Sequence, residues 1–124
     1  MYKIAIIEDA EDNRDLLYYL LRDEFNVTRF SNGEEALREF VDDAPDLIIL
    51  DIWLPGIDGM EVLKQVRQHE HLQSIPVLAL TANAMSGDRE KCLSAGFDEY
   101  ASKPIVDVSE FVAVVRQLLI SSKD

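Results

Sequence analysis

The sequence predicts an α/β domain in which five parallel strands form one sheet covered by helices on both faces, the doubly wound (βα)5 arrangement. Short uninterrupted apolar runs occur at Ile4–Ile7, Leu47–Leu50 and Val77–Leu80, and such runs are typical of parallel strands buried on both faces. Segments with helical periodicity separate them. Regular alternation of strands and helices implies right-handed crossovers within a single sheet.

The apolar runs predict strands at residues 4–7, 47–50 and 77–80. Two further runs, at 27–30 and 99–101, contain polar side chains. Polar residues are typical of strands at the edges of a sheet, so we expect these two strands there. The sequence alone does not order the strands within the sheet.

Each predicted strand is followed by a helical pattern, in which apolar side chains recur three and four residues apart. The four clear stripes are Leu16/Leu17/Leu20/Leu21, Ala36/Leu37/Phe40/Val41, Val62/Leu63/Val66 and Phe111/Val112/Val115/Leu118/Leu119. The segment 84–95 is more polar, with Met85, Cys92 and Leu93 as its apolar side, and predicts a weaker helix. Glycine and proline residues lie between the predicted elements and support these boundaries.

Length and composition indicate one domain, residues 1–124. Apolar residues make up 48% and charged residues 29%, which excludes disorder throughout. The single cysteine, Cys92, excludes an internal disulfide and is typical of a reducing compartment. No apolar run approaches the ~20 residues that span a bilayer, and no signal peptide precedes the first strand. We therefore expect a cytoplasmic, stand-alone domain without membrane insertion.

The net charge limits which classes of binding partner are expected. Twelve Lys and Arg against 24 Asp and Glu give −12. Such a surface repels nucleic-acid phosphates and anionic lipid, so direct DNA binding is not expected. Cations and basic protein surfaces are the natural partners. The alternative, that the acidity serves only solubility, remains open for the overall charge.

Acidic residues follow two of the apolar strands. Glu8 and Asp9 come after the first, and Asp51 ends the third. Ligands of such folds bind beyond the carboxyl ends of central strands, where these side chains would meet. Two like charges about 4 Å apart repel by about 4 kcal/mol at a dielectric constant of about 20. The cluster must therefore raise a pKa or hold a cation, and Mg²⁺ fits oxygen ligands best.

Two more groups reach the same edge of the sheet. Thr81 ends the fourth strand, and Lys103 follows the fifth. A divalent cation, a hydroxyl and an ammonium can together bind the oxygens of a phosphoryl group, and positioning and charge neutralisation are most of what its transfer needs. Asp51 is the best candidate nucleophile, since a carboxylate can form an acyl phosphate.

At this point the chain resembles the receiver domain of two-component response regulators, over essentially its whole length. The matching residues, in order and at the family's spacing, are Glu8–Asp9, Asp51, Pro55–Gly56, Asp58–Gly59, Thr81–Ala82, Tyr100 and Lys103–Pro104. Each motif alone is weak, but together on five βα units they are highly specific. The resemblance implies a flavodoxin/CheY-like fold with strand order 2-1-3-4-5.

The resemblance also implies a phosphorelay function. Asp51 would accept a phosphoryl group from a phosphohistidine on a histidine kinase or histidine phosphotransferase and become a 4-aspartylphosphate. Asp9, Asp51 and the backbone carbonyl of Trp53 would ligate Mg²⁺, for which Mn²⁺ can substitute, and Glu8 would act through a water. Apart from its own phosphorylation and autodephosphorylation, such a protein is not an enzyme.

The remaining family residues imply a switch. Lys103 would pair with Asp51 and then with the phosphate, and its bond to Pro104 is expected to be cis. Thr81 would move toward the phosphoryl oxygen and Tyr100 would swing inward. This couples the site to the face formed by the fourth helix, the fifth strand and the fifth helix, where a downstream protein target would bind.

Kinase specificity is expected on the first helix and in the loop after Pro104. The resemblance implies that the residues of the first helix that contact the kinase are Asn13, Arg14, Leu17 and Tyr18. Two residues depart from the commonest family pattern: Glu8 stands where Asp is more frequent, and Trp53 stands where Met or a smaller residue is common. The resemblance implies that the dephosphorylation rate is tuned at Trp53 and Asn83.

Other classes of protein agree less well with the sequence. An aspartyl-nucleophile phosphatase commonly has an acid two residues after the nucleophile, where this chain has Trp53. A flavodoxin-like binder needs a hydroxyl- and Gly-rich loop where Glu8–Asp12 stands, and no P-loop motif occurs. An isolated receiver of a hybrid histidine kinase remains an alternative. His69 and His71 can bind a metal, but a plain loop is the favoured interpretation.

Overall fold

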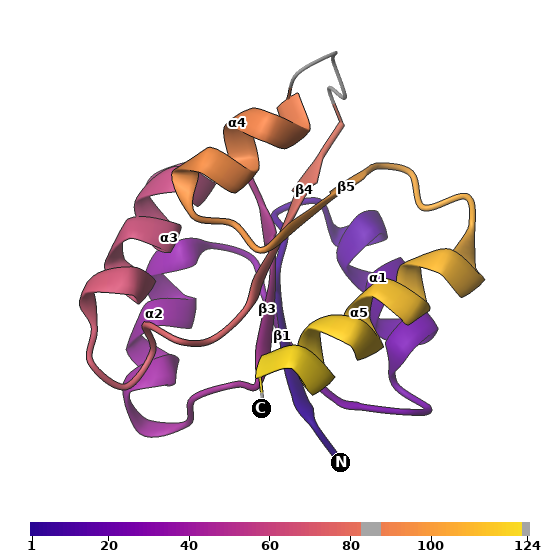
Figure 1. The fold of residues 1–124 in the computed structure, drawn as a ribbon, viewed down its shortest axis with the longest axis horizontal. Helices are drawn as coiled ribbons and strands as arrows, with labels where there is room; N and C mark the ends of the chain where they lie inside the picture. The colour runs from indigo at the N-terminus through magenta and orange to yellow at the C-terminus, as the bar shows by residue number, and fades with distance from the viewer. Residues whose placement is uncertain (83–87, 123–124) are drawn as a thin grey trace.

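The computed structural model describes residues 1–82 and 88–122. Five strands pair in parallel as one sheet, in the order β2-β1-β3-β4-β5 (Figure 1). The strands are β1 (Lys3–Ile7), β2 (Asn26–Phe30), β3 (Leu47–Asp51), β4 (Val77–Thr81) and β5 (Glu99–Ser102). The predicted fold class is confirmed, and so is the strand order that the family resemblance implied.

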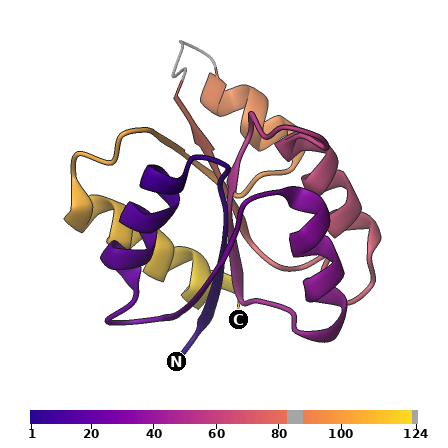
Figure 2. The ribbon, with the colours of Figure 1, turned by 180° about the vertical axis from the view of Figure 1, so that it is seen from behind.

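A helix follows each strand. The helices are α1 (Glu11–Leu21), α2 (Gly33–Asp42), α3 (Gly59–Gln68), α4 (Asp88–Ala95) and α5 (Val108–Ser122). α1 and α5 cover one face of the sheet, and α2, α3 and α4 cover the other (Figures 1 and 2). Within the described ranges, no helix is both long enough and apolar enough to cross a membrane.

The central strands are buried on both faces, as their apolar runs predict. In β1, Ala5 and Ile7 face the core under α2, α3 and α4, while Ile4 and Ile6 face the core under α1 and α5. β3 and β4 alternate in the same way. β2 and β5 lie at the two edges and are less buried, which confirms the edge positions inferred from their polar residues.

Local capping chemistry sets the helix boundaries near the site. The Asn32 side chain caps α2 by accepting the Glu35 N–H at 2.8 Å, and the Asp58 side chain caps α3 by accepting the Glu61 N–H at 3.0 Å. α1 begins differently, because its N-cap residue is Ala10, which offers no side-chain acceptor.

The predicted weaker helix is found in part. α4 begins at Asp88 and ends at Ala95, and Gly96 follows with φ +115°, a conformation that favours glycine. Residues 84–87, which the prediction included, lie outside the described residues, as does Asn83.

A close backbone approach at Gly59 holds the end of β3 in place. The Gly59 N–H donates to the Ile52 carbonyl at 3.0 Å. A Cβ at this position would lie 2.6 Å from the Asp51 carbonyl oxygen and 2.7 Å from the Ile52 Cα. Both neighbours are main-chain atoms of the segment that carries Asp51, so they cannot move away without displacing the backbone.

Replacing Gly59 with alanine therefore tests this packing. Alanine in a helix normally stabilises by up to about 1 kcal/mol relative to glycine. Here the backbone clash outweighs that gain, and we expect Gly59→Ala to lower the free energy of unfolding by about 1–3 kcal/mol in urea denaturation. Met60→Ala, at the neighbouring and 39% exposed position, is the control and should cost less. Unchanged stability of Gly59→Ala would contradict the close approach.

Candidate functional site

The carboxyl ends of β1 and β3 bring three carboxylates together. Glu8 and Asp9 follow β1, Asp51 ends β3, and one carboxylate oxygen from each lies within 4.8 Å of the others. The convergence follows from the topology, because β1 and β3 are neighbours in the sheet. Glu8 and Asp51 are 0% and 3% exposed, whereas Asp9 is exposed. The structure thus brings together the acidic side chains that the sequence predicts at one sheet edge.

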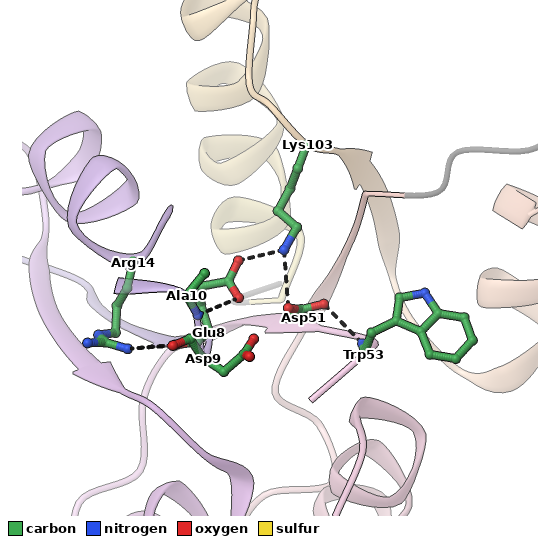
Figure 3. A network of polar contacts seen from close by, with 7 residues as sticks. All are labelled: Glu8, Asp9, Ala10, Arg14, Asp51, Trp53 and Lys103. Carbon is green, nitrogen blue, oxygen red and sulfur yellow. Dashed lines mark hydrogen bonds and ion pairs between the residues drawn. The ribbon is translucent and has the colours of Figure 1, made fainter. Parts of the chain in front are cut away.

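Lys103 supplies the positive charge of the cluster. Its ammonium lies 2.6 Å from Glu8 Oε1 and 3.1 Å from Asp51 Oδ2 (Figure 3). The backbone N–H of Lys103 donates to the Thr81 carbonyl at 2.8 Å, which fixes the residue beside β4. Its peptide bond to Pro104 is cis, as expected. The contact with Asp51 agrees with expectation, and the shorter one with Glu8 was not foreseen.

Hydrogen bonds hold the β1–α1 turn from several directions. The Glu8 N–H donates to the Phe30 carbonyl at 3.0 Å, and Glu8 Oε2 accepts the Ala10 N–H at 3.3 Å. Arg14 Nη1 donates to the Glu8 carbonyl at 2.9 Å and to the Asp9 carbonyl at 3.4 Å (Figure 3). These contacts of Arg14 were not predicted from the sequence. The signal available was a basic side chain one turn into the helix that follows the acidic pair.

Both carboxylate oxygens of Asp51 accept hydrogen bonds. Oδ2 faces Lys103, and Oδ1 accepts the Trp53 N–H at 3.0 Å. The Trp53 indole is 67% exposed and projects away from the carboxylates (Figure 3). The two donors fix the orientation of the Asp51 carboxylate, and the large aromatic ring stands at the rim of the site.

The proximity of the three charged groups shifts their ionisation. Burial and the hydrogen bond with Asp51 raise the pKa of Glu8 from 4.5 to about 7, although Lys103 opposes this. Burial opposes the ionisation of Asp51, but its hydrogen bonds with Glu8, Trp53 and Lys103 together hold its pKa below the usual range. Burial disfavours the Lys103 ammonium, yet its two carboxylate partners raise its pKa. Asp51 therefore remains ionised at neutral pH.

The two residues expected to act as a switch lie on β4 and β5. Thr81 ends β4 and is buried, and the preceding residue, Leu80, pairs with Asp51 in the sheet register. Tyr100 lies on β5 opposite Ala79 and packs, partly buried, against the core under α2, α3 and α4.

Leu17, one of the residues expected to contact the kinase, is not on the surface. Leu17 is 2% exposed and packs in the core under α1 and α5, so its assignment to a kinase-binding surface is wrong. Its neighbours Leu16 and Tyr19 are 41% and 60% exposed instead. The helical stripe identified Leu17 as apolar without showing which member of the stripe faces the sheet.

The histidine pair lies away from the cluster. His69 caps the carboxyl end of α3, the end opposite the site, and its Nδ1 accepts the His71 N–H at 3.2 Å. This bond uses one of the two imidazole nitrogens of His69 within the loop.

The donor set fits a hard divalent cation. Three carboxylates face one ammonium, so negative charge remains after the ion pairs with Lys103 are counted. The three converging side chains offer carboxylate oxygens as ligands. Because Asp9 is exposed, solvent can reach the cluster. Mg²⁺ binds through one or two carboxylates and retains several waters, which this half-open arrangement allows.

A parallel α/β sheet that gathers acidic residues, a lysine and a threonine at its carboxyl edge defines the receiver class of two-component signalling proteins. A model of the response regulator receiver domain matches residues 4–116. The chain therefore belongs to the response regulator receiver family, a family of signalling proteins.

Relatives and solved structures agree with this assignment. The chain is 39% identical to the polar-differentiation response regulator DivK of Brucella anthropi over 117 residues, 94% of each protein. A chain described as a response regulator from Chloroflexus aurantiacus is 34% identical with a TM-score of 0.89, covering 96% of this chain and 98% of that one. The receiver domain of a Pseudomonas aeruginosa sensor histidine kinase is 33% identical with a TM-score of 0.85, at 95% and 97% coverage. That structure holds magnesium in its active-site cleft.

The raised pKa of Glu8 predicts a specific pH dependence of stability. Because the folded state holds the Glu8 proton more tightly than the unfolded state, the stabilisation is complete below pH 4.5 and is lost as the pH rises to about 7. In the absence of divalent cations, we expect the free energy of unfolding to fall across this window by at most about 3 kcal/mol.

Glu8→Gln is the matched variant, because its amide does not titrate. We expect denaturant unfolding between about pH 5 and about pH 7.5 to show a free energy of unfolding that changes less with pH in the variant than in the wild type. Equal slopes in the two proteins would contradict the assignment of the raised pKa to Glu8.

Proposed function

We propose that Asp51 is the phosphoacceptor of this receiver domain and that residues 1–124 act as one domain. One observation carries the proposal: the buried Asp51 carboxylate is held by the Trp53 N–H and the Lys103 ammonium and faces two further carboxylates. Its lowered pKa keeps it ionised, as a nucleophile requires.

The phosphodonor is a phosphohistidine on a histidine kinase or histidine phosphotransferase. An Asp51 carboxylate oxygen forms the new O–P bond, the P–N bond of the phosphohistidine breaks, and its electron pair returns to the imidazole nitrogen. The product is an acyl phosphate on Asp51. Lys103 contributes a positive charge directly beside the acceptor, where negative charge accumulates.

Asp9, Asp51 and the Trp53 carbonyl are the direct ligands that we assign to Mg²⁺ or a substituting Mn²⁺, with Glu8 acting through a water. The cation, when bound, neutralises charge on the transferring phosphoryl group. Support comes from the converging carboxylates and from the magnesium in the cleft of the 33% identical receiver domain. Lys103 competes for Glu8 and Asp51, so the ammonium and the cation share these acids.

The output of phosphorylation is a change of protein contacts. Thr81 turns toward the phosphoryl group and Tyr100 moves inward, which alters the surface of α4, β5 and α5 that a downstream target reads. The burial of Thr81 at the end of β4 and the position of Tyr100 on the adjacent strand support this coupling. The protein catalyses only its own phosphorylation and dephosphorylation.

Relatives of matched length favour a response regulator over the alternatives. The DivK relative is covered over 94% of its length. The phosphatase alternative needs an acid where Trp53 stands. We place the exchange with the kinase in the cytoplasm, because a sequence with a single cysteine is typical of a reducing compartment. Of the recognition residues first expected, Asn13 and Tyr18 remain candidates for kinase contact.

Phosphorylation with acetyl phosphate and Mg²⁺ tests the acceptor. We expect intact-mass spectrometry to show one added phosphoryl group on the wild type and none on Asp51→Asn. The amide preserves the shape of the side chain but is not a nucleophile. A thermal unfolding curve confirms that the variant is folded, and phosphorylation of the folded variant would remove Asp51 from the proposed role.

Trp53 provides a probe of cation binding. Its backbone N–H donates to Asp51, so Mg²⁺ at the carboxylates should change the fluorescence of the nearby indole. We expect Asp9→Asn to abolish this response, because it removes the exposed carboxylate of the cluster. Asp12→Asn makes the same charge change in the first turn of α1, outside the cluster, and should retain the response. Equal responses of the two variants would exclude Asp9 as a ligand.

A further inference from the structure

The side chain of Arg14 turns back from α1 toward the acidic turn rather than outward to a partner. Its Nη1 donates to the carbonyl of Glu8 at 2.9 Å and to that of Asp9 at 3.4 Å (Figure 3). These two carbonyls belong to the successive peptide groups on either side of the Asp9 Cα. Restraining both peptide groups restrains φ and ψ of Asp9 and therefore the direction of its Cα–Cβ bond, from which the carboxylate extends.

Asp9 needs such a restraint more than the other two acids. Glu8 and Asp51 are buried, and Lys103 bonds to both of them. Asp9 is exposed, so packing does not orient it. The helix that follows gives little help, because Ala10 at its N-cap provides no side-chain cap.

We infer that Arg14 is a positioning residue of the cation site, which holds the Asp9 carboxylate toward Glu8 and Asp51. The inference rests on the proposed function, since it assigns Arg14 an effect on the ligand Asp9. Removing a residue that orients a metal ligand commonly lowers the metal affinity about 10- to 100-fold. Arg14 suits the task because Nη1 of its planar guanidinium carries two N–H groups, and this nitrogen reaches both carbonyls.

Charge alone predicts the opposite effect of removing Arg14. A guanidinium beside a cation site repels the cation, so its neutral replacement should strengthen Mg²⁺ binding if Arg14 acts only through its charge. A positioning role predicts weaker binding. The sign of the change in affinity therefore separates the two explanations.

The experiment is a Mg²⁺ titration of Arg14→Met followed by Trp53 fluorescence, with Arg22→Met as the control. Arg22 lies at the C-cap of α1 and contacts the Tyr19 ring, so its replacement removes the same charge far from the turn. We expect the Kd for Mg²⁺ to rise about 10-fold in Arg14→Met and to stay near the wild-type value in Arg22→Met.

An unchanged or lower Kd in folded Arg14→Met overturns the inference. If that variant does not fold, Arg14→Lys replaces it, because it keeps the charge but loses the planar group. We expect Arg14→Lys to raise the Kd about 3-fold, within the cost of a single weakened hydrogen bond, and a wild-type Kd overturns the inference. The proposed function fails separately, if the wild type itself neither binds Mg²⁺ nor is phosphorylated on Asp51.

Discussion

The site depends on the repulsion between carboxylates that the sheet forces together. Glu8 and Asp51 are both buried at the ends of adjacent strands, and one ammonium, that of Lys103, contacts both. A single positive charge cannot neutralise two buried negative charges. Burial and the hydrogen bond with Asp51 raise the pKa of Glu8 to about 7. Burial opposes the ionisation of Asp51 as well, but its hydrogen bonds with Glu8, Trp53 and Lys103 hold its pKa below the usual range. The pKa values of the two acids therefore shift in opposite directions. Glu8 accepts a proton near neutral pH, and Asp51 keeps its charge.

The fold brings the acidic side chains together and also places Lys103 beside them. Parallel strands end at one edge of the sheet, and the order β2-β1-β3-β4-β5 places the acids of β1 and β3 next to each other. The same parallel arrangement brings the end of β4 to this edge, where the Thr81 carbonyl holds the backbone of Lys103. The central strands carry no polar side chains except at their ends, so the core under both helical layers is undisturbed by the site. Apolar burial thus sets the strand positions, and the strand positions set the electrostatics.

The sequence predicted the parts of the structure that depend on backbone topology. Apolar runs identify the strands, and acids at the strand ends must meet if the strands are neighbours, so the approach of Asp9 to Asp51 was foreseeable. The preference of Lys103 for Glu8 was not, because it depends on side-chain conformations that spacing does not determine. The burial of Leu17 was missed for a related reason. Its helical stripe also contains Leu16, and only the rotation of α1 on the sheet decides that Leu17 is buried and Leu16 is 41% exposed.

The three acids are held in different ways, and the difference bears on the proposed phosphorylation. Glu8 and Asp51 are fixed by burial and by Lys103, whereas the peptide groups that carry Asp9 are fixed by Arg14. In the proposed reaction, a phosphoryl group on Asp51 would add negative charge that competes with Glu8 for the Lys103 ammonium. Because the Lys103 N–H is bonded to the Thr81 carbonyl, a shift of this lysine acts directly on the strand end that carries Thr81. The shared ammonium thereby links the charge on Asp51 to the β4–β5 side of the sheet.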